Sequence, residues 1–244
     1  MMSALYLKEI RSFLHSIIGY IAMVVFLLLL GTFMWIIPNG SNVFDNGFAT
    51  IDPLFVLAPW VFLFLTPAIT MRSFAEEARN GTMEFLLTKP LNDIQIVLAK
   101  YFAGVTLVLL SLLPTLVYYY TVSELGNPKG NIDSGGMWGS YIGLFFLASA
   151  FIAIGIFASA LVKDQVSAFI LAVALCFLCY TGFGFISSIS LFGKFDAFIL
   201  NLGINEHFIS MSRGVIDSRD VVYFVSLSLL FILGTRTVIE SRKW

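Results

Sequence analysis

Two cysteines, Cys176 and Cys179, have the Cys-x-x-Cys spacing that redox-active dithiols use. Both lie in the middle of a long run rich in Leu, Phe and Ala, where a negatively charged thiolate would be poorly solvated. We therefore interpret them as small apolar side chains of a buried helix, and we predict no redox chemistry at this pair.

The sequence also lacks the motifs of nucleotide and metal sites. The Gly-rich stretch at 126–130 has the composition of a turn rather than of a phosphate-binding loop, and there is no His-Glu-x-x-His zinc motif. The two histidines, His15 and His207, fall at opposite ends of the expected membrane topology, so they cannot share a metal ion. We predict no catalytic, cofactor-binding or metal site. The net charge of −1 argues against a nucleic-acid partner.

One segment, residues 72–97, is rich in charge. Its acidic and basic side chains are Arg72, Glu76, Glu77, Arg79, Glu84, Lys89 and Asp93. Residues 73–79 favour a helix, Asn80-Gly81 is a turn signal, and Thr82 can cap a second short helix that Pro90 ends. A simple connector between two spans needs only a few residues, far fewer than the segment 72–97 contains. The pattern therefore favours a docking site for a cytoplasmic partner over a solvated loop.

The composition of the whole chain sets this charged segment apart. Apolar residues make up 59% of the 244 residues and charged residues 12%, whereas a soluble domain has roughly 45–50% and about 25%. So many apolar side chains do not fit inside one water-soluble core, and large exposed apolar patches cause association. The composition excludes a soluble enzyme, a nucleic-acid-binding domain and a disordered regulator, and it indicates an integral membrane protein.

The stretches between charged residues are long enough to cross a bilayer as helices, which need ~20 residues each. They are continuous apolar runs without the alternation of barrel strands, so we predict an all-α protein with one transmembrane domain over residues 1–244. Six spans are expected, near residues 17–37, 54–71, 98–122, 138–161, 166–190 and 221–239. The last is the weakest, because Arg236 has to reach the headgroups from within it.

The Lys and Arg residues give the orientation of the chain. With the N-terminus inside, ten of them fall on the inner side and four on the outer side, namely Lys129, Lys194, Arg213 and Arg219. This distribution follows the positive-inside rule and predicts that both termini are cytoplasmic. No charged residue lies at the centre of a span, which disfavours an ion-coupled secondary transporter.

Two further segments are expected at the membrane surfaces. Residues 3–15 can form an amphipathic interfacial helix, with Leu5, Ile10 and Phe13 on one face; the alternative is the frayed start of the first span. The outer stretch 191–220 holds too many apolar residues for a free loop. We predict that it forms short helices that rest in or re-enter the outer leaflet.

The charged segment also carries a family resemblance. Residues 76–90, Glu-Glu-Ala-Arg-Asn-Gly-Thr-Met-Glu-Phe-Leu-Leu-Thr-Lys-Pro, resemble the signature loop of ABC-2 type ABC-transporter permeases. The resemblance implies the ABC-2, type V exporter-like fold, with six spans, an N-terminal interfacial helix and a cytoplasmic coupling helix after the second span. Shorter pieces, including Ala58-Pro59-Trp60 and the stretch 214–221, resemble the gliding-motility-associated permease subunits of Bacteroidota.

This resemblance implies a bacterial inner-membrane subunit, without enzymatic activity, that couples ATP hydrolysis by a separate ABC ATPase to export, here in gliding motility. ATP and Mg would bind the ATPase. The other implied partners are membrane lipids and a second permease chain, either another copy or a companion membrane subunit with a large external domain. The implied coupling surface consists of Glu76, Glu77, Arg79, Gly81, Thr82 and Glu84. The alternative is a non-transporting membrane scaffold for an ATPase-linked motility or secretion complex.

Overall fold

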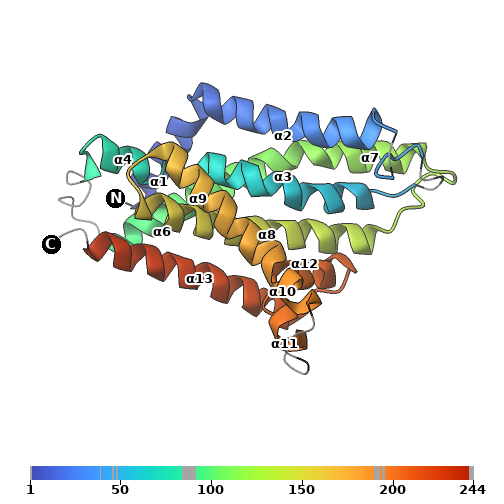
Figure 1. Cartoon of the computed structure of the whole chain (residues 1–244). Coiled ribbons are helices and arrows are strands. Elements are labelled where there is room, and N and C mark those ends of the chain that lie inside the picture. The colour runs from blue at the N-terminus through green and yellow to red at the C-terminus, as the bar shows by residue number, and fades with distance from the viewer. Residues whose placement is uncertain are drawn as a thin grey trace.

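The computed structural model describes residues 2–38, 40–45, 47, 49–83, 92–189, 193 and 196–241. These residues form helices joined by turns, and none of them belongs to a β-strand (Figure 1). The helices are α1 (Met2–Leu14), α2 (Ile17–Trp35), α3 (Asp52–Thr70), α4 (Ala75–Arg79), α6 (Asp93–Leu112), α7 (Leu116–Leu125), α8 (Ser134–Leu161), α9 (Gln165–Phe177), α10 (Phe183–Ser188), α11 (Asp196–Leu200), α12 (Ile204–Ser212) and α13 (Ser218–Ser241). The all-helical prediction is confirmed for this part of the chain.

Two irregular segments connect these helices. A short 3₁₀ helix, η1 (Leu113–Thr115), separates α6 from α7 and contains Pro114, which cannot continue an α-helix without loss of a hydrogen bond. A π-helix, η2 (Leu178–Gly182), separates α9 from α10. π-Helical turns are rare and often occur at functional sites.

Five helical stretches are long and apolar enough to cross a membrane. They are Asp52–Arg79, Asp93–Leu125, Ser134–Leu161, Gln165–Ser188 and Ser218–Ser241. The first predicted span corresponds to α2, which is bent by 66° from α1, and counting these two helices as one broken span gives six. The span that the sequence supports least is a single helix, α13, of 24 residues.

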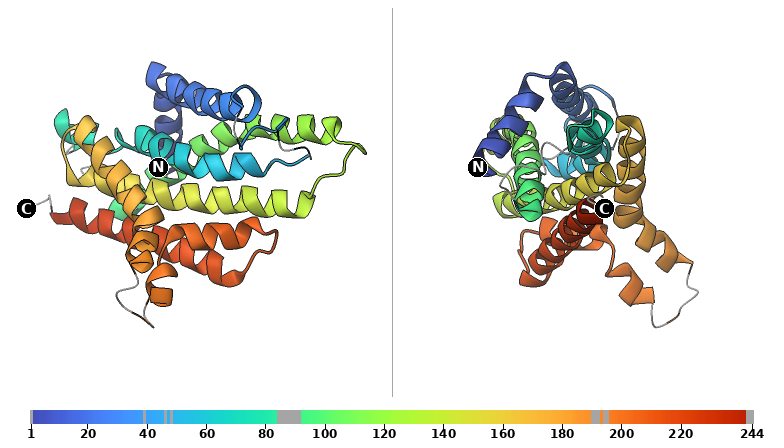
Figure 2. Two further views of the ribbon diagram at one scale, coloured as in Figure 1. Left: turned by 45° about the vertical axis from the view of Figure 1, so that its right-hand side comes forward. Right: turned by 90° about the vertical axis from the view of Figure 1, so that its left-hand side faces the viewer.

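α8 lies at the centre of the bundle and packs against α3, α9 and α13 (Figures 1 and 2). The apolar part of α8 is 78% buried, against 17% for the stretch Gln165–Ser188 and 28% for α13. Small residues permit close packing of helices; a Cβ on Gly155 of α8, for example, would collide with Thr70 of α3. The chain itself leaves much of the apolar surface of α9, α10 and α13 uncovered.

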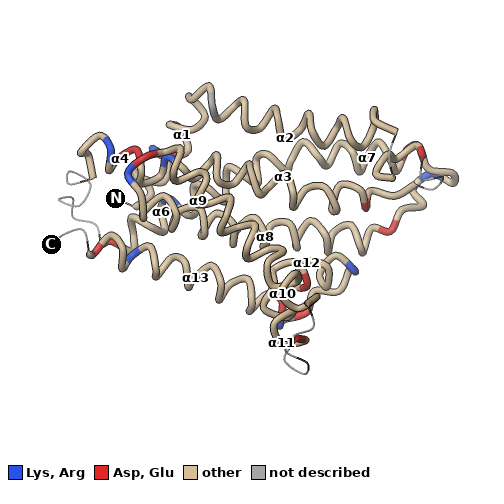
Figure 3. Tube along the Cα trace, in the orientation of Figure 1, with Lys and Arg blue, Asp and Glu red and all other residues tan. Residues whose placement is uncertain are grey.

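Charged residues gather at the two ends of the bundle and around α10, α11 and α12, while the middle of the long helices has few (Figure 3). α4 lies at one end, where α1 also begins and α13 ends (Figure 1). This separation fits a bundle that spans a membrane, because charges are costly in its apolar centre. The assignment of the α4 end to the cytoplasm stays a prediction.

Both surface segments predicted from the sequence contain helices. α1 packs along α6, with Tyr6 Oη 2.8 Å from Thr106 Oγ1. Within 191–220, α12 packs against α8 and α13, and its side chains Phe208 and Met211 are buried. α10 and α11 project sideways from the bundle (Figure 2). The position of these segments relative to the membrane stays a prediction.

Candidate functional site

The predicted coupling segment contains one short described helix, α4, with the sequence Ala-Glu-Glu-Ala-Arg. Ala, Glu and Arg are good helix formers. The helix stops at Asn80, and Gly81 takes a φ of +68°, a left-handed conformation that commonly ends helices. The backbone N–H of Thr82 then donates to the carbonyl of Glu77 at 3.0 Å. The helix and turn expected at 73–81 are therefore present.

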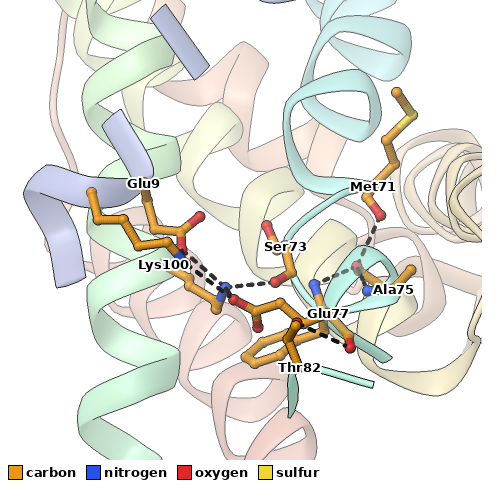
Figure 4. A network of polar contacts seen from close by, with 10 residues as sticks. Glu9, Met71, Ser73, Ala75, Glu77, Thr82 and Lys100 are labelled. Atoms are coloured by element: carbon orange, nitrogen blue, oxygen red, sulfur yellow. Dashed lines mark hydrogen bonds and ion pairs between the residues drawn. The ribbon is translucent and has the colours of Figure 1, made fainter. Parts of the chain in front are cut away.

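The start of α4 is fixed by a side chain from α8. The hydroxyl oxygen of Ser159 accepts hydrogen bonds from the backbone N–H groups of Phe74 (3.0 Å) and Ala75 (3.1 Å). The same hydroxyl donates to the carbonyl of Met71 at 3.1 Å (Figure 4). Ser159 is fully buried. It does for α4, from a distant helix, what an N-cap residue does from the adjacent position in the chain.

Lys100 of α6 places its ammonium group beside α4. Its Nζ donates to the carbonyl of Ser73 at 2.6 Å, to Glu77 Oε1 at 3.0 Å and to Glu9 Oε1 at 3.2 Å (Figure 4). An ammonium group has three donors, so all of them are used. The Lys100 side chain is 1% exposed, and its Nζ lies 4.9 Å from the centre of the Phe74 ring. We name Lys100, Glu77 and Glu9 the Lys100 cluster.

The Lys100 cluster is stable only as a unit, because a buried charge is costly unless it is paired. Lys8 lies 3.5 Å from both carboxylates and brings a second positive charge from the exposed side. Glu77 Oε2 is buried and has no hydrogen-bond partner among the described residues. Pairing with Lys100 therefore compensates the burial of Glu77 and holds α1, α4 and α6 together.

Two further contacts extend the site. Arg79 Nη1 lies 3.7 Å from Asp164 Oδ1 at the start of α9, but this pair is exposed and its energy is small. The backbone N–H of Ser167 donates to Asp164 and lowers the pKa of this carboxyl below its ordinary value. Arg72 Nη1 donates to Ser16 Oγ at 3.0 Å, which ties the loop before α4 to the bend between α1 and α2.

The structure brings most of the predicted coupling residues together on α4 and the turn that follows it. Arg79, Gly81 and Thr82 are exposed, and Glu76 is half-buried. Glu77 differs from them because its carboxylate faces inward to Lys100, so it joins α4 to the bundle. Glu84 lies outside the described residues. So does the second helix expected before Pro90, except for Met83.

Sequence reasoning does not single out Lys100, Glu9 or Ser159. Lys100 carries a weak signal, because it is a lone charge with apolar neighbours on both sides, from Ile96 to Ala103. A cation in such surroundings needs a partner. No comparable signal marks Ser159, which lies among other small residues of α8.

The sequence that forms these apolar helices and the segment between α3 and α6 matches a known protein family. A family model described as ABC-2 family transporter protein matches residues 37–235, which is most of the chain. The chain belongs to the ABC-2 transporter family. It is thus a multi-pass transmembrane permease of an ABC transporter, a type of subunit that in general has an ABC ATPase as partner. The search of curated proteins finds no match.

The cysteines of this ABC-2 permease lie inside the bundle. Cys176 is fully buried and Cys179 is half-buried, and both are free thiols. The thiol of Cys176 contacts the carbonyl oxygen of Phe151 at 3.8 Å. Among the residues that the structure describes, no group of three or more His, Cys, Asp or Glu side chains could hold a metal ion.

The two histidines of the permease lie far apart, as the sequence predicts. His15 is exposed in the bend after α1, while His207 lies on α12. His207 Nδ1 lies 2.7 Å from Asp220 Oδ1, and Nε2 lies 2.9 Å from the carbonyl oxygen of Asn201. The imidazole stacks on Tyr223 with the ring centres 3.8 Å apart. These contacts, which the sequence does not indicate, fasten α12 to α13.

Proposed function

We propose that α4 and the turn after it form the surface through which a separate ABC ATPase drives this permease. The observation that carries the proposal is the attachment of α4. Arg79 of the helix is exposed, as are Gly81 and Thr82 in the turn after it. The other side of the helix is bound to α8 through Ser159 and to α6 through the Lys100 cluster. A surface helix with these attachments passes a displacement on to the spans.

The attachments decide which helices follow α4. Moving α4 away from α6 separates Glu77 from Lys100 and leaves buried charges unpaired, at a cost of about 3–5 kcal/mol. Moving it away from α8 removes the acceptor of two buried backbone N–H groups. We infer that α4, α6 and α8 move as one unit and that Glu9 draws α1 along. ATP binding by the ATPase would thereby change the packing of the spans.

In this proposal the α4 end of the bundle, with both termini, faces the cytoplasm of a bacterial inner membrane. ATP and Mg²⁺ bind the ATPase, so the permease itself has no enzymatic activity. The uncovered faces of α9, α10 and α13 contact lipids and a second permease chain, either a copy or a companion subunit with a large external domain. The sequence resemblance to gliding-motility permeases of Bacteroidota supports gliding motility as the process served.

The contact surface is tested by charge reversal. Glu76→Arg and Arg79→Glu are expected to lower the amount of ABC ATPase that co-purifies with the permease by about tenfold, because like charges across an interface are strongly unfavourable. Glu124→Arg is the matched control, since Glu124 is 48% exposed and belongs to α7, far from α4. Unchanged ATPase recovery with both α4 variants contradicts the proposed surface.

Lys100→Met separates a transporter from a scaffold. The substitution leaves the exposed face of α4 in place but removes its link to α6, so we expect ATPase binding to persist while permease-dependent ATP turnover falls. Because Ser159 also ties α4 to α8, the decisive chain is the double variant Lys100→Met with Ser159→Ala: if it folds and keeps wild-type turnover, α4 only holds the ATPase. The chain would then be a membrane scaffold.

A further inference from the structure

A cavity of about 490 Å³ lies at the opposite end of the bundle from the α4 site. α3 forms one wall, α12 another, the start of α8 the floor, and η2 the inner end. Its volume falls within the range of small-molecule sites, which is roughly 300–1,000 Å³. The residues that carry the argument are Asp52, Trp60, Asp133, Tyr180, Phe208 and Arg213.

The cavity is lined by charged residues at its outer end and by aromatic residues in its deeper part. Asp52 is the first residue of α3, Asp133 precedes α8, and Arg213 follows α12, so the charges lie where these helices meet the surface. Ser140 of α8 donates to the carbonyl of Ser212, which places the end of α12 beside the start of α8. The charged groups therefore share one end of the cavity. None of the three has an ion-pair partner among the described residues.

The aromatic residues line the deeper part. Trp60 lies eight residues after Asp52 on α3, which is ~12 Å along a helix. The Trp60 ring meets the Tyr180 ring edge to face, with centroids 5.7 Å apart. Tyr180 belongs to η2 and is 5% exposed, and the described residues offer its hydroxyl no hydrogen-bond partner. The π-helical turn thus presents an aromatic ring with a free polar atom at the inner end of the cavity.

The side of the cavity is open to the apolar surface of the bundle. Val56 and Trp60 of α3 are 62% and 47% exposed, and Ile209 of α12 is 37% exposed. These three apolar residues all line the cavity, and in a membrane they face acyl chains rather than water. A molecule can therefore enter sideways from the membrane with its polar end toward the charged rim.

We propose that this cavity binds a phospholipid with a zwitterionic phosphoethanolamine headgroup. Arg213 pairs with the phosphate, Asp52 and Asp133 pair with the ammonium group, and the upper acyl chain lies along Trp60, Tyr180 and Phe208. A carboxylate pair and a guanidinium at one end, with aromatic rings at the other, match this molecule in both charge and polarity. The site lies far from α4, so it does not depend on the proposed ATPase coupling.

The test is native mass spectrometry of the full chain in detergent, titrated with phosphatidylethanolamine, phosphatidylglycerol or diacylglycerol. The first phosphatidylethanolamine is expected to bind about tenfold more tightly than diacylglycerol, because charge-assisted hydrogen bonds are made only by the headgroup. Arg213→Gln reduces this difference without disturbing the fold, since Arg213 is exposed. Trp60→Ala lowers the affinity for all three lipids.

Phe64→Ala is the matched control for Trp60→Ala. Phe64 lies one turn further along α3, is 57% exposed and does not line the cavity, so its loss leaves lipid binding unchanged. Equal affinity for phosphatidylethanolamine and diacylglycerol overturns the proposal, and so does an equal effect of the two aromatic substitutions. Phosphatidylglycerol that binds as tightly as phosphatidylethanolamine overturns the role of Asp52 and Asp133.

Discussion

Lys100 Nζ lies 3.0 Å from Glu77 Oε1, so a buried cation of α6 is neutralised by a carboxylate of α4 that is 23 residues away in the chain. The pair joins α6, a long apolar helix that begins a candidate membrane span, to the short helix α4. Buried ion pairs add little to stability compared with apolar packing, but breaking one is costly. This pair therefore fixes where α4 sits.

Lys100→Met is expected to lower the free energy of unfolding by about 3–5 kcal/mol, because Glu77 and Glu9 are left without their cation. The measurement is the unfolding of the purified chain in detergent, followed by circular dichroism in denaturant. Adding Glu77→Gln to Lys100→Met should recover part of the loss, since the second substitution removes one unpaired charge.

Lys129→Met is the control for this pair. Lys129 also lies 3.0 Å from a glutamate, Glu124, but its side chain is 75% exposed. Exposed pairs contribute about 0–1 kcal/mol, so this variant should unfold almost as the wild type does. Similar losses for Lys129→Met and Lys100→Met would mean that burial of Lys100 has no energetic consequence.

Ser159→Ala tests the cap that α8 provides for α4. The substitution leaves the buried N–H groups of Phe74 and Ala75 without their acceptor, and loss of a cap costs about 0.5–2 kcal/mol. Hydrogen exchange of the segment 74–79 should increase more than that of α8. Ser149→Ala is the matched control, because Ser149 lies on the same helix and donates only to the carbonyl of Phe145 within it. Equal exchange in the two variants contradicts a capping role for Ser159.

Much of the fold can be predicted from the sequence, because the bilayer imposes length and polarity on each span. The uncharged runs locate the helices, and Asn80-Gly81 marks the end of α4 through the left-handed conformation of Gly81. The charged segment between α3 and α6 also identifies the family. These features depend on neighbouring residues in the chain, and their physical basis is local.

The contacts of the α4 site depend instead on residues far apart in the sequence. Ser159 contacts Phe74 across 85 positions, and Lys100 contacts Glu9 across 91. A serine in an apolar helix more often bonds its own backbone, so nothing local distinguishes one that caps another helix. The π-helix η2 likewise cannot be predicted from the sequence, because its residues do not differ in type from the rest of the apolar run around them.

Gly139→Ala tests the packing of α12 on α8. A Cβ at Gly139 would lie 2.7 Å from the carbonyl oxygen of Met211 and 2.8 Å from Gly214 Cα, which are backbone atoms that cannot rotate away. We expect a loss of about 1–3 kcal/mol in the free energy of unfolding from this overpacking. Gly184→Ala is the control, because a Cβ on Gly184 of α10 meets nothing within 4 Å. This change should be neutral or stabilising, since Ala favours helix.

Both ring nitrogens of His207 have hydrogen-bond partners. The carbonyl of Asn201 can only accept, so His207 Nε2 carries a proton. Nδ1 lies 2.7 Å from Asp220 Oδ1, which is hydrogen-bond distance. Asp220 is buried, and its Oδ2 has no hydrogen-bond partner among the described residues, so His207 compensates the burial of this carboxyl.

Substitutions of His207 and of Asp220 should therefore lower the free energy of unfolding by unequal amounts. His207→Ala leaves Asp220 unpaired and is expected to cost about 3–5 kcal/mol. Asp220→Asn should cost less than about 1 kcal/mol, because the new amide can donate to a neutral Nδ1 while Nε2 still binds Asn201. In the double variant His207→Ala with Asp220→Asn, the loss should be smaller than the sum of the two single losses, since no carboxyl remains buried. Unfolding of the four chains in detergent measures this coupling, and strictly additive losses would show that the two side chains do not act as a pair.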